Sequence, residues 1–162
     1  IVDRMTVVCI GGNPIGCEKP GWEFNFGNDV EAANTVLHCG GDIWLIPNNV
    51  YGTMHIGFGE IQRRIAPYGE IGTLLYENLI SFYETENASW SAGESWSLGD
   101  SPAVGVTLEP NCGSFMYCKA PEVQEDTSYR YPENSPQIRV YTSINSRFII
   151  EDFISKLQIL YG

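Results

Sequence analysis

The stretch MTVVCIGG, residues 5–12, decides the fold class of this chain. Its apolar run up to Ile10 is nearly continuous, which is typical of a strand buried on both faces, as in a parallel sheet. The glycine pair Gly11–Gly12 then turns the chain at the carboxyl end of that strand. Because open α/β sheets bind ligands at this edge, we expect a site in the residues that follow.

A helix and a second strand follow at the spacing of a βαβ unit. Asn28 or Asp29 can N-cap a helix that ends at Gly40–Gly41. Residues 43–46 (IWLI) then read as the next buried strand. We therefore predict an α/β protein with an open, mostly parallel sheet, flanking helices and a right-handed crossover. The residues of the helix that would face the sheet are Val30, Ala33 and Leu37.

The rest of the chain gives clearer helices than strands. The apolar spacing predicts a short helix at 59–64, a longer one at about 69–85 and a final one through 148–160. Residues 102–108 alternate like a strand but begin like a helix, with a cap followed by proline, and we follow the helix. We expect loops at 13–21, 89–97 and 110–136, and a strand at 137–141 at a sheet edge.

The segment GWEFNFGNDVEAAN, residues 21–34, carries the candidate site. In an extended segment, side chains at i and i+2 point the same way, so Glu23 and Asn25 would reach one ligand while Phe24 points back into the protein. A carboxylate accepts hydrogen bonds and an amide both donates and accepts, which suits adjacent sugar hydroxyls. The alternative is a loop whose Glu and Asn only face water.

These motifs together resemble the inosine-uridine nucleoside hydrolases. Gly11–Gly12, Glu23–Asn25 and the helix start from Asn28 match the family in order and spacing, and residues 98–104 (LGDSPAV) look like its C-terminal His-Asp segment. The resemblance weakens between about 111 and 135. It covers only the C-terminal half of the family pattern, without the aspartate-rich motif that supplies most calcium ligands.

The resemblance implies hydrolysis of the N-glycosidic bond of a nucleoside to free base and sugar. Glu23 and Asn25 match the ribose-binding positions, Phe24 matches the motif's aromatic position, and Ile10 stands where the family usually has Met. Asp100 matches a calcium-binding aspartate. Calcium takes six to eight oxygen ligands, so Asp100 would need aspartates from a missing N-terminal half.

The resemblance fails at Gly99, where many relatives have a histidine that protonates the leaving base. Glycine cannot do so. Trp90 and Trp96 are candidate leaving-base contacts by stacking, and His55 is a third candidate; each has an ordinary packing or structural role as its alternative. Glu94 is a candidate acid, with a solvated loop carboxylate as its alternative. No residue of this chain is a certain catalytic group.

Composition excludes several kinds of partner. The formal charge of −11 disfavours nucleic acid and anionic membranes, and no apolar run approaches the length of a membrane span. The five cysteines match no zinc pattern, and we expect reduced thiols rather than a Cys112–Cys118 disulfide. We predict a cytoplasmic location.

We therefore predict that residues 1–162 form a single-domain fragment, the C-terminal part of a nucleoside hydrolase-like domain. Its expected partners are a nucleoside or sugar and the missing N-terminal half. Because a half-sheet exposes an apolar edge, we expect that edge to associate with the missing half or with another copy of the chain. The isolated chain should be inactive. The alternatives are a non-catalytic nucleoside- or carbohydrate-binding protein on this scaffold and a structural fragment.

Overall fold

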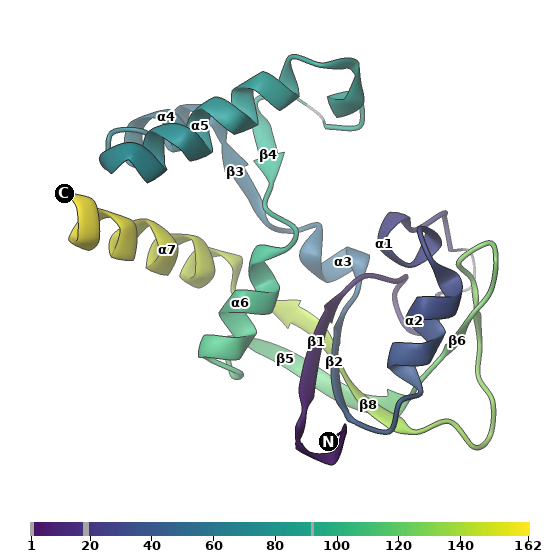
Figure 1. Cartoon of the computed structure of the whole chain (residues 1–162). Helices are drawn as coiled ribbons and strands as arrows, with labels where there is room; N and C mark the ends of the chain where they lie inside the picture. The colour runs from purple at the N-terminus through teal and green to yellow at the C-terminus, as the bar shows by residue number, and fades with distance from the viewer. Residues whose placement is uncertain (1, 18–19, 92) are drawn as a thin grey trace. The chain divides into compact units, whose positions relative to one another are not determined.

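The computed structural model describes residues 2–17, 20–91 and 93–162 (Figure 1). The chain divides into two compact units, each with its own apolar core. Unit 1 comprises the chain up to Gly52 together with Asp100–Asn145, and unit 2 comprises Thr53–Gly99 together with Ser146–Gly162. The loops predicted at 13–21 and 89–97 include residues 18, 19 and 92, which lie outside the described residues. That the chain forms a single domain stays a prediction.

A four-stranded sheet with the order β1–β2–β8–β5 forms the centre of unit 1. β1 pairs with β2 and β2 with β8 in parallel, whereas β5 pairs with β8 antiparallel. The predicted α/β class with an open, mostly parallel sheet is confirmed. The strands are β1 Thr6–Ile10, β2 Asp42–Ile46, β5 Gly113–Lys119 and β8 Gln137–Ile144.

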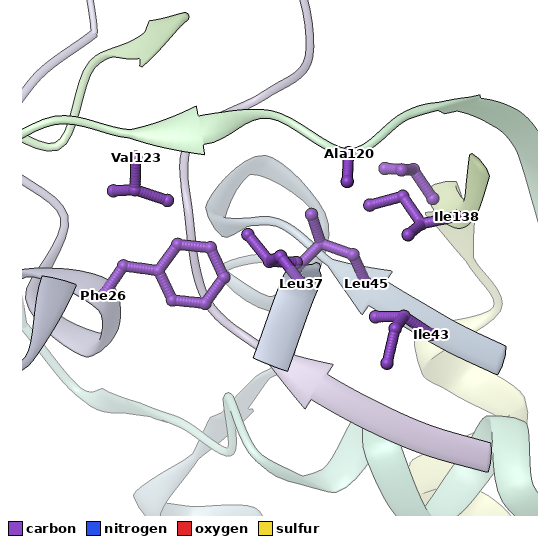
Figure 2. Close-up of a cluster of buried hydrophobic side chains, with 8 residues drawn as sticks. Phe26, Leu37, Ile43, Leu45, Ala120, Val123 and Ile138 are labelled. Atoms are coloured by element: carbon purple, nitrogen blue, oxygen red, sulfur yellow. The ribbon is translucent and has the colours of Figure 1, made fainter. Parts of the chain in front are cut away.

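Helix α2, Val30–Leu37, packs on one face of this sheet. The side chain of Asp29 caps it, accepting a hydrogen bond from the Ala32 N–H at 2.8 Å. Leu37 is buried against Ile43 and the neighbouring residues of β2, and Figure 2 shows the ring of Phe26 pointing into the same cluster. Burying each such side chain stabilises the fold by about 1.5–3 kcal/mol. The predicted strand–helix–strand unit is confirmed.

Helix α6, Ser101–Leu108, resolves the ambiguous segment as a helix. Pro102 lies in its first turn, where a missing backbone N–H costs nothing, and Val106 is fully buried. Figure 1 shows α2 and α6 on opposite sides of β1 and β2. The shorter elements of unit 1 are η1 Val2–Arg4, α1 Phe24–Gly27, α3 Asn48–Tyr51, β6 Glu122–Val123 and β7 Tyr129–Arg130.

Two sequence predictions for the sheet of unit 1 are wrong, namely the loop at 110–136 and the edge position of the strand at 137–141. The segment 110–136 is not one long loop, because it contains β5 and the β6–β7 hairpin. The strand at 137–141 extends to Ile144 and lies inside the sheet, between β2 and β5. β5 escaped prediction because most of its residues are exposed and its register shifts between Ser114 and Phe115, so it has no regular apolar alternation.

In the described residues, unit 2 contains three main helices and a two-stranded antiparallel sheet of β3 and β4, and its core contains Ile56, Ile61 and Ile154. Arg64 joins two of the helices, because its guanidinium binds Glu151 at 2.7 and 2.8 Å and Glu60 at 2.6 Å. The predicted helices are confirmed, but the loop at 89–97 is wrong where β4 forms. The elements are β3 His55–Gly57, α4 Phe58–Arg64, α5 Gly69–Tyr83, η2 Glu86–Ala88, β4 Ser95–Ser97 and α7 Ser146–Tyr161.

None of the helices in the described ranges is both long and apolar enough to cross a membrane. All five cysteines are free thiols, with Cys17 and Cys39 exposed and Cys112 buried. Burial raises the pKa of the Cys9 thiol to about 11.

Candidate functional site

Glu23 lies at the carboxyl edge of the parallel strands, and its carboxylate is almost completely buried, at 2% exposure. Oε2 accepts hydrogen bonds from the Gly12 N–H at 2.7 Å and the Phe26 N–H at 2.9 Å. Oε1 accepts from the Asn25 N–H at 3.2 Å and from the Tyr51 hydroxyl at 2.7 Å. This single carboxylate therefore joins the turn after β1, the start of α1 and the end of α3.

The extended conformation predicted for residues 23–25 is wrong. Glu23 is the N-cap of α1, so its side chain turns inward to satisfy backbone N–H groups that a helix start leaves free. Phe24 does not point into the protein but is 69% exposed, while Phe26 is the buried aromatic residue. Glu23 and Asn25 therefore do not present their side chains side by side. Whether they bind a sugar stays a prediction.

Ile10 and Asn25 do lie together. Both line a hollow of about 310 Å³ between the end of β1 and the first turns of α2, with Asn28 and Asp29 on its polar side. The hollow is otherwise lined mainly by apolar side chains such as Ala33 and Val36. The structure thus brings two of the four predicted ligand contacts, Ile10 and Asn25, to one surface depression, whose lining does not include Glu23 or Phe24.

Both Glu23 and Asp100 influence the phenol of Tyr51. Burial raises the pKa of the Tyr51 phenol well above its usual range, and the hydrogen bond to Glu23 and the charges of Glu23 and Asp100 raise it further. Asp100 is exposed and makes no side-chain capping bond at the start of α6, although it occupies the N-cap position. Glu23 therefore acts on the Tyr51 phenol through a hydrogen bond and its charge, and Asp100 through its charge.

A buried polar cluster surrounds the Glu23 backbone. Asn13 donates from Nδ2 to the carbonyl oxygens of Gly21 and Thr127, each at 3.0 Å, and accepts from the Asn48 amide at 3.2 Å. Thr127 accepts a hydrogen bond at Oγ1 from the Glu23 N–H at 3.0 Å. The hydroxyl of Tyr129 is also buried, and burial raises the pKa of this phenol.

Gly12 is required by this packing. Its φ is 80°, and a Cβ at that position would lie 2.1 Å from the hydroxyl oxygen of Tyr129 and 2.6 Å from the Phe26 ring. A side chain here would therefore displace the residue whose N–H binds Glu23.

The donors among the described residues do not by themselves fit calcium. The described residues contain no group of three or more His, Cys, Asp or Glu side chains that could hold a metal ion. Calcium needs six to eight oxygen ligands, and Asp100 supplies one carboxylate. Glu23 is a poor second ligand, since its oxygens already accept four hydrogen bonds.

The candidate leaving-base residues all belong to unit 2. His55 is an exposed residue of β3, with Nδ1 3.4 Å from the Ser95 hydroxyl. The Trp96 ring packs against unit 2's core, with its centroid 5.2 Å from that of Trp90, which is 62% exposed. Glu94 is exposed. Their roles toward a nucleobase stay predictions.

Sequence reasoning missed Tyr51, Asn13 and Thr127. A signal existed for Tyr51, because it follows a strand that ends at the ligand-binding edge. Nothing comparable pointed to Thr127, which lies in the segment predicted as a long loop.

Comparison with known proteins supports the fold. No family model matches this sequence, and no curated protein matches it. Solved structures do match. They include a plant nucleoside hydrolase, PpNRh1, with a TM-score of 0.78 at 16% identity, covering 94% of this chain and 53% of that one.

Two bacterial enzymes match over a similar part of their length. A purine-preferring ribonucleoside hydrolase from Gardnerella vaginalis has a TM-score of 0.67 at 18% identity, covering 96% of this chain and 51% of its own. An inosine-uridine preferring nucleoside hydrolase from Bacillus anthracis has a TM-score of 0.57 at 18% identity, covering 94% and 49%. The chain spans about half the length of these structures. The resemblance seen in the sequence is thus confirmed at the level of the fold: this chain has the fold of about half of a nucleoside hydrolase.

Proposed function

We propose that this chain is the C-terminal part of a longer protein that hydrolyses the N-glycosidic bond of ribonucleosides to free base and sugar. The observation that carries the proposal is the buried carboxylate of Glu23 at the Gly11–Gly12 turn, on a fold shared with three nucleoside hydrolases. The isolated chain is inactive in this proposal, because its described residues hold neither a metal cluster nor an obvious base for an attacking water.

Tyr51 indicates how Glu23 would engage a ribose. Of the four donors to the carboxylate, Tyr51 is the side chain, and the other three are backbone N–H groups. A ribose hydroxyl can take the place of the Tyr51 hydroxyl without disturbing α1. The Glu23 charge would then favour positive character on the sugar ring as the bond to the base breaks.

The remaining roles follow the motif. Asn25 and Ile10 would contact the sugar from the hollow that they line, and Phe24 would present its exposed ring beside it. Asp100 would contribute one oxygen ligand to a calcium ion completed by the rest of the protein. His55, Trp90 and Trp96 would contact the leaving base.

A non-catalytic binding protein on the same scaffold is the second candidate. Gly99 favours it, because glycine cannot protonate a leaving base. The saturation of Glu23 by internal hydrogen bonds also favours it, since a carboxylate with this many partners has a structural role whether or not chemistry occurs.

Release of free base from inosine, uridine and adenosine by the full-length protein with calcium tests the proposal. We expect release from at least one nucleoside and a loss of at least about 100-fold in Asp100→Ala, as for removal of one electrostatic group from an active site. The matched control is Glu31→Ala, an exposed carboxylate in the first turn of α2. Binding of nucleosides without release of base would select the second candidate.

A further inference from the structure

Thr127 lies at the tip of the β6–β7 hairpin in a backbone conformation that threonine rarely adopts. Its φ is 62°, and no other non-glycine residue in the described part of the chain has a positive φ. Glycine adopts this conformation readily, whereas for a β-branched residue it is a genuine outlier. The threonine side chain must therefore supply something that glycine cannot.

The hydroxyl of Thr127 joins segments that are distant in sequence. Oγ1 accepts a hydrogen bond from the Glu23 N–H at 3.0 Å and donates to the Gly21 carbonyl at 3.2 Å. The Asn13 amide lies 3.4 Å from the same oxygen and donates to the Thr127 carbonyl at 3.0 Å. The residue itself is 1% exposed.

These contacts hold the segment that contains Glu23. The fully buried polar or charged side chains among the described residues are Asn13, Glu23 and Thr127, and they form one cluster. Thr127 holds the backbone of Glu23, while the Glu23 carboxylate holds the Gly12 N–H and the Tyr51 hydroxyl. Moving the Glu23 backbone would therefore misplace the carboxylate relative to both.

We propose that Thr127 is a positioning residue that fixes the Glu23 carboxylate at the carboxyl edge of the sheet. The strained conformation persists because it aims the hydroxyl at the Glu23 N–H. The inference deepens the proposed function, and it rests on that function only for the role of Glu23 toward a ribose.

Three variants of the chain test this. Thr127→Gly relieves the backbone strain and removes the hydroxyl, and Thr127→Ser keeps the hydroxyl. Asp126→Ala is the matched control, because Asp126 accepts a bond from the Ser128 N–H in the same turn at 3.0 Å, on an exposed surface. It therefore perturbs the hairpin without touching the Glu23 segment.

Amide hydrogen exchange and the Cζ chemical shift of Tyr51 report the position of Glu23. We expect Thr127→Gly to speed exchange of the Glu23 N–H by about tenfold, the effect of one lost hydrogen bond, and to shift the Tyr51 Cζ signal. Thr127→Ser and Asp126→Ala should leave both near wild type. Unchanged signals in Thr127→Gly would overturn the proposal, and so would an equal acceleration of all amides in unit 1, which would mark a purely structural role.

Titration with inosine separates this inference from the proposed function. If the wild-type full-length protein binds inosine, Thr127→Gly should weaken binding by about tenfold, and Thr127→Ser should restore it. If Thr127→Gly binds inosine as the wild type does, the positioning role is rejected. If the wild type binds none of inosine, uridine and adenosine, the ribonucleoside function is rejected, and the exchange measurement still decides whether Thr127 positions Glu23.

Discussion

Glu23 and Asp100 each precede a helix in unit 1, and the two carboxylates are used in opposite ways. Glu23 is buried, caps α1 and accepts four hydrogen bonds. Asp100 is exposed and caps none of the N–H groups of α6. A carboxylate whose oxygens bind backbone N–H groups stabilises the fold, whereas one that makes no capping bond leaves its oxygens open to solvent. Glu23 and Asp100 both match the motifs of the predicted site, but substituting Glu23 should lower the free energy of unfolding far more than substituting Asp100.

Glu23→Ala should give the largest effect on stability. It leaves the buried N–H groups of Gly12 and Phe26 without acceptors, at about 1–3 kcal/mol each, and removes the partner of Tyr51 as well. We expect the free energy of unfolding to fall by about 3–5 kcal/mol. Urea unfolding of the chain measures it.

The matched variant is Glu31→Ala, which removes an exposed carboxylate and should change stability by less than about 0.5 kcal/mol. If Glu23→Ala costs no more than Glu31→Ala, the carboxylate of Glu23 has no structural role and the contrast with Asp100 disappears.

Tyr51→Phe should have a smaller effect that depends on pH. The variant loses one hydrogen bond to Glu23, so we expect about 1–2 kcal/mol less stability near neutral pH. Because folding raises the pKa of the Tyr51 phenol, this contribution is complete below the unfolded value of about 10 and is lost as the pH rises above it.

Unfolding free energies of wild type and Tyr51→Phe should therefore converge above about pH 10. Tyr129 also has a raised phenol pKa, but it is present in both proteins and its contribution cancels. Curves that stay parallel into the alkaline range would show that the Tyr51 phenol has no special environment.

Asp29 is the intermediate case between Glu23 and Asp100. It is exposed like Asp100, but it caps α2 through one hydrogen bond to the Ala32 N–H. Asp29→Ala should cost about 1 kcal/mol, and Asp29→Ser should recover most of it because serine also caps. Thermal unfolding of the two variants checks this. A serine variant as unstable as the alanine one would mean that the cap is not what Asp29 contributes.

The sequence predicted those parts of unit 1 whose local signals agree with the tertiary fold. The apolar run before Gly11, the cap at Asp29 and the glycines after α2 all indicate one strand–helix–strand unit, and the structure contains it. β5 lacked such a signal because it is mostly exposed, and without it β8 seemed to be an edge strand.

The candidate site was harder to predict because its geometry depends on long-range hydrogen bonds. An E-x-N pattern places two side chains together only if the segment is extended. Here the segment begins a helix instead, because the Glu23 carboxylate accepts hydrogen bonds from the Gly12 and Phe26 N–H groups. Tyr51 and Thr127 reach Glu23 from 28 and 104 residues away in the chain. No local pattern indicates the contact of Thr127, and for Tyr51 the sequence indicates only that it follows a strand at this edge, not that it binds Glu23.

Asp100→Ala should have the smallest effect on stability and is the sharpest test of the comparison. The exposed side chain makes no capping bond, so we expect the free energy of unfolding to change by less than about 0.5 kcal/mol. Since the charge of Asp100 raises the pKa of the Tyr51 phenol, its removal should lower that pKa, which the alkaline titration of the Tyr51 ring signal measures. Asp100→Glu, which keeps the charge, is the control. A large loss of stability would mean that Asp100, like Glu23, is held by the protein, and then neither carboxylate would stand out as a ligand-binding group on structural grounds.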